Sequence, residues 1–184
     1  MKVLNNDELK IEFIEQSDIP SIVKLLKENG MNYGSVELYS EYFIKVCLGE
    51  KIIGCVAIIP RKGFSEVKSL IVEEKYRSFK IFNKMCNIIT YIGKEHNNPC
   101  VVLKVDKNNP AILLYRRKGF EPMIKEEYEE IYGQLRNDCI TCHTIVKTIC
   151  NPTYFIFDLR KKIPDHPAFI NSDKKSLKEV GTII

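Results

Sequence analysis

The sequence predicts an α/β or α+β fold in which a mixed sheet carries helices on its faces. Short apolar runs that are typical of strands alternate along the chain with stretches whose apolar residues recur at helical spacing. The 184 residues are 45% hydrophobic and 28% charged, enough for the core of one globular domain or of a domain with a small appendage. We find no internal repeat and no low-complexity segment, so disorder is not the expected state.

The first expected element is a strand over Ile11–Gln16, where apolar and polar residues alternate. A helix follows it and ends at Gly30. Ser17 or Asp18 supplies the N-cap of this helix, and Pro20 stands in its first turn. Both ends of the helix are therefore marked in the sequence.

The middle of the chain predicts a second short helical stretch over Val36–Tyr42 and then a β-hairpin over Tyr42–Pro60. Gly49 and Glu50 form the turn of that hairpin. A further strand covers Glu66–Val72 and leads into a turn rich in basic residues.

Periodic apolar residues predict a long helix over Lys80–His96, which is followed by a strand over Cys100–Val105. A shorter helix begins at Ala111 and ends at Gly119, a position where a left-handed residue is expected. Residues 120–132 fit a strand and a helix equally well.

The chain closes with a strand over residues 153–161 and a tail from Ile163 that we expect to be peripheral. The predicted order is β-α-α-β-β-β-α-β-α-β-β. We expect one domain over residues 1–162, with a cysteine-containing insertion at about residues 133–152, and the tail over residues 163–184.

Charge and composition exclude several classes of protein. The formal net charge is +4, but the 28 basic residues are dispersed among 24 acidic ones, which falls short of a nucleic-acid-binding surface. The first thirty residues lack the apolar core of a signal peptide, and no stretch approaches the roughly 18 apolar residues of a membrane span. We therefore expect a cytoplasmic protein with no nucleic-acid or membrane partner, whose seven cysteines are reduced.

The segment VVLKVDKNNPAILLYRRKGFEP, residues 101–122, carries the most specific motif. A strand ending in valine is followed by an asparagine, an alanine, an aliphatic-tyrosine pair and a closing Gly-Phe. This motif resembles that of the GNAT superfamily, acyltransferases that move an acetyl or related acyl group from coenzyme A to an amine. The matching residues are Asn108, Ala111, Leu114, Tyr115, Gly119 and Phe120. The resemblance covers residues 11–122 and the strand near Tyr154, and it implies a GNAT-like, mostly antiparallel central sheet with helices on both faces.

In the family, a tyrosine placed like Tyr115 points at the coenzyme A sulfur and protonates the leaving thiolate. A phenol suits this task because its ordinary pKa, about 10, is not far above that of a thiol. Asn108 can bond backbone or cofactor amide groups, and Ala111 lets its helix approach a neighbour closely. The alternative is that Tyr115 is an ordinary core aromatic residue.

Attack on a thioester requires a neutral amine, so a base must remove a proton from the acceptor. Glu66 aligns with the glutamate that some GNAT enzymes use as this base, whereas other members use no single residue. The alternative is an ordinary exposed glutamate at a strand end. Lys68 should face the same side of the strand as Glu66, where it could lower the pKa of that carboxylate or bind an acidic substrate.

The resemblance also implies where coenzyme A binds. The backbone of Leu70, Ile71 and Val72 is expected to bond the pantetheine arm at a place where this strand splays from the next. The turn that follows should bind the pyrophosphate, and its residues are Arg77, Ser78, Phe79, Lys80, Ile81 and Phe82. Lys80 and Phe82 occupy the two positions where the family pattern has glycine and then glycine or alanine, so side chains add bulk there. Lys75, Arg77, Lys80 and Lys84 add positive charge around the helix start.

A cysteine-containing segment lies outside the resemblance. Cys139 and Cys142 have the spacing that lets two thiolates reach one Zn²⁺, and Cys150 or His143 could join them. A closed structural site needs four ligands, and no second pair is present. The fourth ligand would be His143, His96, His166 or a residue of another chain. A redox pair and simply packed thiols are the alternatives.

We therefore expect an enzyme that transfers an acetyl group from acetyl-CoA to a primary amine of a small molecule or peptide, as a monomer or homodimer. Two alternatives remain open at this point. One is a GNAT-like domain, weakly active or inactive, that binds coenzyme A or a partner. The other is an interaction protein organised by a cysteine-based metal site.

Overall fold

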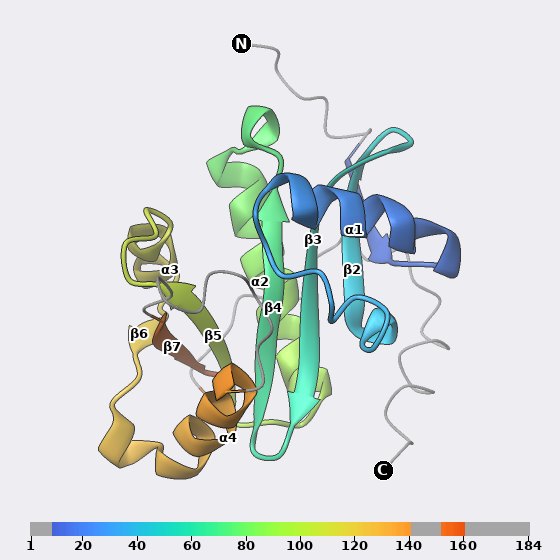
Figure 1. Cartoon of the computed structure of the whole chain (residues 1–184). Helices are drawn as coiled ribbons and strands as arrows, with labels where there is room; N and C mark the ends of the chain where they lie inside the picture. Colours follow the sequence, from blue (N-terminus) through green and yellow to red (C-terminus); the bar gives the residue numbers. More distant parts are fainter. Residues whose placement is uncertain (1–8, 141–151, 161–184) are drawn as a thin grey trace.

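The structure is a computed structural model that describes residues 9–140 and 152–160. Its centre is a seven-stranded sheet with the strand order β1-β2-β3-β4-β5-β7-β6 (Figure 1). The strands are β1 (Leu9–Phe13), β2 (Phe43–Leu48), β3 (Lys51–Arg61), β4 (Phe64–Val72), β5 (Cys100–Asp106), β6 (Glu121–Pro122) and β7 (Pro152–Asp158). The β4 and β5 strands pair in parallel, and every other neighbouring pair is antiparallel. The predicted mixed, mostly antiparallel sheet is confirmed.

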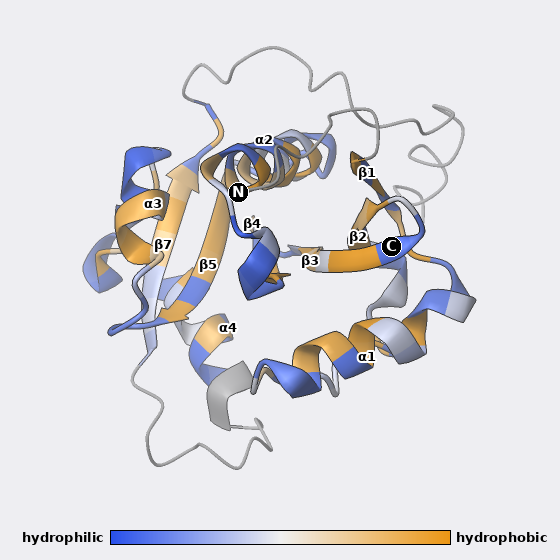
Figure 2. Cartoon of the chain, turned by 90° about the horizontal axis from the view of Figure 1, so that it is seen from above, coloured by the Kyte–Doolittle hydropathy of each residue, from blue (hydrophilic) through white to orange (hydrophobic). Residues whose placement is uncertain are grey.

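Helices cover both faces of this sheet, as expected (Figure 2). They are α1 (Ile19–Glu28), α2 (Phe79–Glu95), α3 (Ile112–Arg117) and α4 (Glu129–Ile140). Short 3-10 turns precede or join them: η2 (Gln16–Asp18), η3 (Ser40–Tyr42), η4 (Glu74–Tyr76) and η5 (Lys125–Glu127). The α2 helix lies on one face, and α1 and α4 lie on the other.

Three apolar clusters explain this arrangement. The largest joins α2 and α3 to the sheet and is built on residues such as Ile81, Met85 and Ile89, which recur at helical spacing. A second cluster packs the Ile22 and Leu26 side of α1 against the opposite face of the sheet. A third cluster packs α4 on the same face of the sheet as α1, against β5 and β7. The sheet is thus buried on both faces, which fits its nearly continuous apolar strands.

Several local predictions are confirmed. The hairpin between β2 and β3 turns at Gly49, whose φ of 59° is left-handed. Gly119 follows α3 with a φ of 88°, as a residue after a helix end should. Asp18 is the N-cap residue of α1, but its side chain does not cap that helix: it accepts from Glu15 N, in the capping box of η2, and from Lys45 Nζ.

Two predictions of secondary structure are wrong. The stretch Val36–Tyr42 consists of turns and the short η3, not of a regular helix. The predicted order also lacks α4, which begins inside the ambiguous stretch 120–132 and continues into the expected insertion. Ile131, Tyr132 and Leu135 form its apolar side against the third cluster, and the last of these lies beyond the stretch.

The strand ends also move: β1 begins at Leu9 and ends at Phe13, and β4 begins at Phe64. In the described ranges, no helix is long and apolar enough to cross a membrane. The tail from Ile163, together with Cys142, His143 and Cys150, lies outside the described residues.

Candidate functional site

The sheet opens between β4 and β5. Their parallel pairing extends only from Ser65↔Val101 to Val67↔Leu103. Beyond Val67, β4 pairs within the described chain with β3 alone, and this pairing shifts its register next to Ser69. Ser69 has a left-handed φ of 55°, which marks an irregularity of the bulge type in β4. The strand splay expected at Leu70, Ile71 and Val72 is therefore present.

Glycine on β3 supports this opening from behind. A Cβ atom on Gly54 would lie 2.6 Å from the carbonyl oxygen of Ile71, a distance that no real side chain tolerates. The absence of a side chain lets β3 approach the end of β4 this closely. Cys55 adds a bond from its Sγ to the carbonyl oxygen of Ser69 at 3.4 Å.

The turn after β4 presents free donors at the start of α2. Ser78 is the N-cap and accepts a bond from Ile81 N at 3.3 Å. No group among the described residues accepts from the backbone N–H groups of Ser78, Phe79 and Lys80. Since α2 is 17 residues long, its positive dipole end adds to these donors. The expected anion-binding features are thus available without glycine.

Lys80 and Phe82 have ordinary negative φ angles within α2, so the backbone itself does not require glycine there. The difference from the family pattern is one of side-chain bulk. Lys80 is exposed, whereas Phe82 is half-buried and packs on the main core.

The four expected cations are not equivalent. Arg77 is exposed, and its Nε donates to the carbonyl oxygen of Val72 at 2.9 Å. Lys75 lies 3.8 Å from the carboxylate of Glu73, which also pairs with Lys51. Burial, with a contribution from Lys80, lowers the pKa of Lys84. Arg77 and Lys80 are therefore the cations best placed for an anion at the helix start.

Tyr115 on α3 is 6% exposed and lies between two other aromatic rings. Its ring centroid is 5.5 Å from that of Phe82 and 6.0 Å from that of Phe120. Burial, with a smaller contribution from Cys86, raises the pKa of Tyr115 well above its usual value. The phenol is therefore a neutral proton donor at physiological pH.

Asn108 and Asn109, which precede α3, make contacts that differ from our expectation. Asn108 is exposed, and its backbone N–H donates to the Oδ1 atom of Asp106 at 2.9 Å. The side chain that bonds the backbone belongs to Asn109, whose Oδ1 accepts from Ala111 N at 2.9 Å. Ala111 packs against the main core, which fits the close approach expected of its helix. The NNP sequence held a signal for Asn109, because asparagine often bonds the backbone two residues ahead.

Glu66 is buried, with 3% of the residue exposed, and its carboxylate is held by two cations. Its Oε2 atom accepts from Arg61 Nε at 3.0 Å and from Arg61 Nη2 at 2.9 Å. The Nζ atom of Lys68 lies 3.3 Å from its Oε1, so the predicted shared side of the strand is confirmed. The ring of Tyr39 lies over both cations, at 5.3 Å from Arg61 Cζ and 5.7 Å from Lys68 Nζ.

Sequence reasoning missed Arg61 and Tyr39. Arg61 faces Glu66 only because β3 and β4 form a tight hairpin, in which Arg61 pairs with Phe64 and Ile59 with Glu66. Gly63, in the turn, was the available signal. Tyr39 reaches this position through the irregular loop after α1, and nothing in the sequence predicts that contact.

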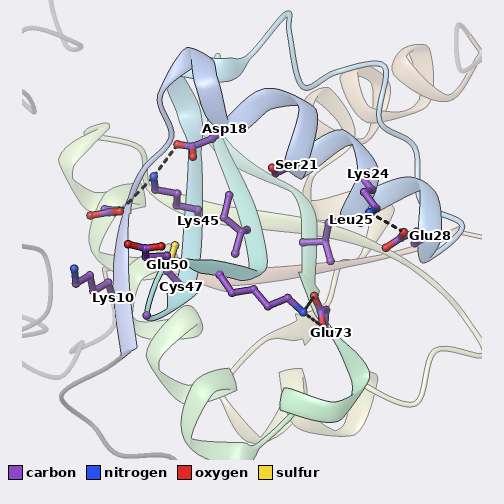
Figure 3. Close-up of a pocket in the computed structure, with 14 residues that line it drawn as sticks. Lys10, Asp18, Ser21, Lys24, Leu25, Glu28, Lys45, Cys47, Glu50 and Glu73 are labelled. Carbon is purple, nitrogen blue, oxygen red and sulfur yellow. Dashed lines mark hydrogen bonds and ion pairs between the residues drawn. The ribbon is translucent and has the colours of Figure 1, made fainter.

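A cavity of about 590 Å³ lies elsewhere, between α1 and the hairpin of β2 and β3 (Figure 3). Lys45 lines this cavity. Its Nζ atom lies 2.7 Å from Asp18 Oδ2 and 3.3 Å from Glu12 Oε1. The rest of the lining contains further lysines and carboxylates, together with a few apolar and small residues. No residue expected to bind coenzyme A lines it, so it is distinct from the opening between β4 and β5.

The zinc hypothesis concerns residues that the structure does not place together. Cys139 belongs to α4, and its predicted co-ligands Cys142, His143, Cys150 and His166 lie outside the described residues. His96, the remaining candidate in this chain, lies at the end of α2, where its Nδ1 atom is 3.0 Å from Ser65 Oγ. Within the ranges that are described, no three His, Cys, Asp or Glu side chains form a group suited to a metal ion.

The sequence matches a family profile described as the acetyltransferase (GNAT) family over residues 11–120. A search of curated proteins finds no match. Similar solved structures include an N-acetyltransferase from Staphylococcus aureus Mu50, with 16% identity and a TM-score of 0.62. That similarity covers 83% of this chain and 98% of the staphylococcal one.

Two further structures are known with ligands. The N-acetylglutamate synthase of Neisseria gonorrhoeae, complexed with coenzyme A and L-arginine, is 14% identical with a TM-score of 0.62. The similarity covers 83% of this chain but only 34% of the synthase, so the chain matches about a third of that protein. The NatC complex bound to Gag peptide and coenzyme A is 17% identical with a TM-score of 0.59, over 82% of this chain and 98% of the other. At such identities the likeness concerns the fold.

Proposed function

Because the chain belongs to the acetyltransferase (GNAT) family, we propose that it transfers an acetyl group from acetyl-CoA to a primary amine by direct attack on the thioester. The observation that carries this proposal is the family match, which includes the motif around Tyr115. The buried phenol and the free N–H groups at the start of α2 lie on the elements that flank the opening between β4 and β5.

Coenzyme A would bind along this opening. The unpaired N–H groups of Ser78, Phe79 and Lys80 suit the pyrophosphate, with Arg77 and Lys80 adding charge. The end of β4, which β5 does not pair, leaves backbone groups near Leu70–Val72 for the pantetheine arm. Asn108 is exposed beside α3 and is thus available to a ligand, while Ala111 keeps α3 packed on the core.

Tyr115 would act as the general acid. The amine nitrogen attacks the thioester carbonyl carbon, the C–S bond breaks, and the departing thiolate takes the phenolic proton. Solvent then returns a proton to the phenolate. Burial keeps the proton on the phenol at neutral pH, but the raised pKa also makes Tyr115 a weaker acid than a free phenol, so the acid role is supported by the position of Tyr115 in the motif and not by its pKa.

The base that deprotonates the amine is less well supported. Glu66 remains the residue that aligns with the base of some relatives, but both of its carboxylate oxygens already face cations. A water molecule that reaches the amine is the alternative route for this proton. The acceptor itself is proposed to be a small molecule or a peptide, since relatives with this fold were solved with either kind of ligand.

One alternative has an observation in its favour. A GNAT-like domain that binds coenzyme A without efficient turnover is favoured by the side chains of Lys80 and Phe82, which stand where the family pattern has small residues. We further propose that residues 1–162 form one domain, as a monomer or homodimer, with the tail peripheral to it.

The test combines binding and turnover. We expect acetyl-CoA to raise the melting temperature and to give calorimetric heat, and we expect thiol release with at least one member of a panel of primary amines. Tyr115→Phe should lower kcat about 10- to 100-fold with little change in acetyl-CoA affinity, because only the proton donor is removed. Tyr132→Phe is the control, since Tyr132 lies on α4 and packs against the third cluster, in contact with Tyr154.

Absence of both a thermal shift and calorimetric heat at saturating acetyl-CoA would refute the enzyme proposal. Binding without turnover across the whole panel would favour the coenzyme A-binding domain. Equal kcat for Tyr115→Phe and the wild type would remove the acid role.

A further inference from the structure

Four aromatic rings form a row from the start of α2 to β7. Phe82 on α2 packs on Tyr115, with 5.5 Å between ring centroids and 53° between ring planes. Tyr115 packs edge-on against Phe120 at 6.0 Å, and Phe120 continues the row to Phe157 at 5.3 Å. Tyr115 is thus the member of the row that has a hydroxyl group, and a phenylalanine ring lies on each side of it.

The two neighbours of Tyr115 are held in different ways. Phe120 is 1% exposed, and its backbone N–H donates to the carbonyl oxygen of Tyr115 at 3.1 Å. It is therefore part of the same local turn as Tyr115. Phe82 is half-buried and comes from another element, and it stands between the buried Tyr115 and the exposed end of α2. Cys86 lies one helical turn after Phe82. It is the titratable group that adds to the effect of burial on the pKa of Tyr115.

We propose that Phe82 is a positioning residue, which holds the ring of Tyr115 in place and keeps water from it. The chemical consequence rests on the proposed function, whereas the ring contact does not. A glycine or alanine at position 82 would leave one face of the Tyr115 ring without a partner. The bulk of the Phe82 side chain therefore has two effects. It keeps the backbone of the turn further from the cofactor, and it holds the proton donor Tyr115 in place.

Aromatic rings in contact stabilise each other's orientation by more than their buried area alone would. Removal of one ring opens a space that water can enter. Two effects on Tyr115 follow. Its ring samples orientations that do not lead to reaction, and its phenol becomes better solvated, which moves the pKa down toward the ordinary value.

The first test separates kcat from KM. We expect Phe82→Ala to lower kcat about tenfold, while KM for acetyl-CoA stays the same or falls, because bulk near the cofactor is removed. Phe82→Tyr keeps a ring and should retain kcat. Phe13→Ala is the matched control: it removes a half-buried ring that packs on the same main core, but Phe13 lies on β1 and no ring contact in the described part of the chain joins it to Tyr115.

The second test needs no activity. In protein labelled with ¹³C at the tyrosine Cζ atoms, the Tyr115 signal is assigned by its loss in Tyr115→Phe. At about pH 11 we expect Tyr115 to stay protonated in the wild type and in Phe13→Ala, but to ionise in part in Phe82→Ala. A merely structural role for Phe82 would lower the melting temperature without selecting this signal.

The outcomes are distinguishable. If a folded Phe82→Ala keeps the wild-type kcat, or if its Tyr115 titrates as in the wild type, the positioning role is refuted while acetyl transfer stands. If the wild type shows no turnover but the Tyr115 signal responds to Phe82→Ala alone, the ring contact is upheld and the proposed function fails.

Discussion

At the scale of single residues, Glu66 shows how partners change the meaning of a side chain. A glutamate at a strand start suits either an exposed position or a base, but this one is buried and bonded on both oxygens. Arg61 and Lys68 each face it, and the ring of Tyr39 lies over both cations. Such a cluster is well suited to join β3, β4 and the loop after α1.

Glu66→Gln separates the two roles. We expect the variant to lose about 1 to 3 kcal/mol of unfolding free energy, because two partly buried cations lose their counter-charge. The measurement is urea unfolding at pH 7, with Glu28→Gln as the control, since the Glu28 pair with Lys24 is exposed. A base role would show as a large loss of kcat in a variant that is still folded, and an unchanged unfolding free energy would contradict the structural role.

At the scale of elements, α2 combines two opposing demands. Its first turn carries Lys80 and, one turn later, Lys84, although positive charge is unfavourable at the start of a helix. Burial and the nearby Lys80 lower the pKa of Lys84, which reports this crowding. The same charges favour an anion at the free N–H groups of Ser78 and Phe79.

Lys80→Gln should therefore act in opposite directions on two measurements. The ligand-free protein should melt at a slightly higher temperature, because repulsion at the helix start is relieved. Affinity for coenzyme A, measured by calorimetry, should fall about 3- to 10-fold, and the loss should shrink as salt is added.

Lys94→Gln, at the other end of α2, provides the control for Lys80→Gln and should leave coenzyme A affinity unchanged. Equal affinities of Lys80→Gln and the wild type at low salt would show that this charge does not meet the cofactor.

At the scale of the whole molecule, a buried polar network joins β4, the end of α2 and the segment leading into β5. Asn98 Nδ2 donates to Ser65 Oγ at 3.1 Å, and Ser65 Oγ and His96 Nδ1 share a hydrogen bond of 3.0 Å. Ser65 is fully buried, and burial lowers the pKa of His96 to about 4. The imidazole is therefore neutral in the folded protein at physiological pH.

This network predicts a dependence of stability on pH. The unfolded histidine binds a proton near pH 6.5 and the folded one only near pH 4, so its contribution is complete above 6.5 and is lost as the pH falls through 4. We expect a loss of about 1 to 2 kcal/mol over this range, allowing for partial exposure. His96→Asn should flatten the curve of melting temperature against pH. Parallel curves for His96→Asn and the wild type would contradict this.

The sequence by itself determined the features that depend on neighbouring residues. Helical periodicity located α2, and glycine positions located the hairpin at Gly49 and the end of α3 at Gly119. The motif around Tyr115 was specific enough to indicate the family, which the profile match then showed. These signals are local because they reflect backbone geometry and the spacing of side chains along one element.

Only the tertiary structure decided which side chains meet. The contacts of Arg61 with Glu66, of Tyr39 with Arg61 and of Phe82 with Tyr115 each join residues from different elements. Such contacts depend on strand register, and a shift such as the one beside Ser69 changes them without any signature in the spacing of apolar residues. The family could therefore be predicted from the sequence, whereas the surroundings of its candidate acid and base could not.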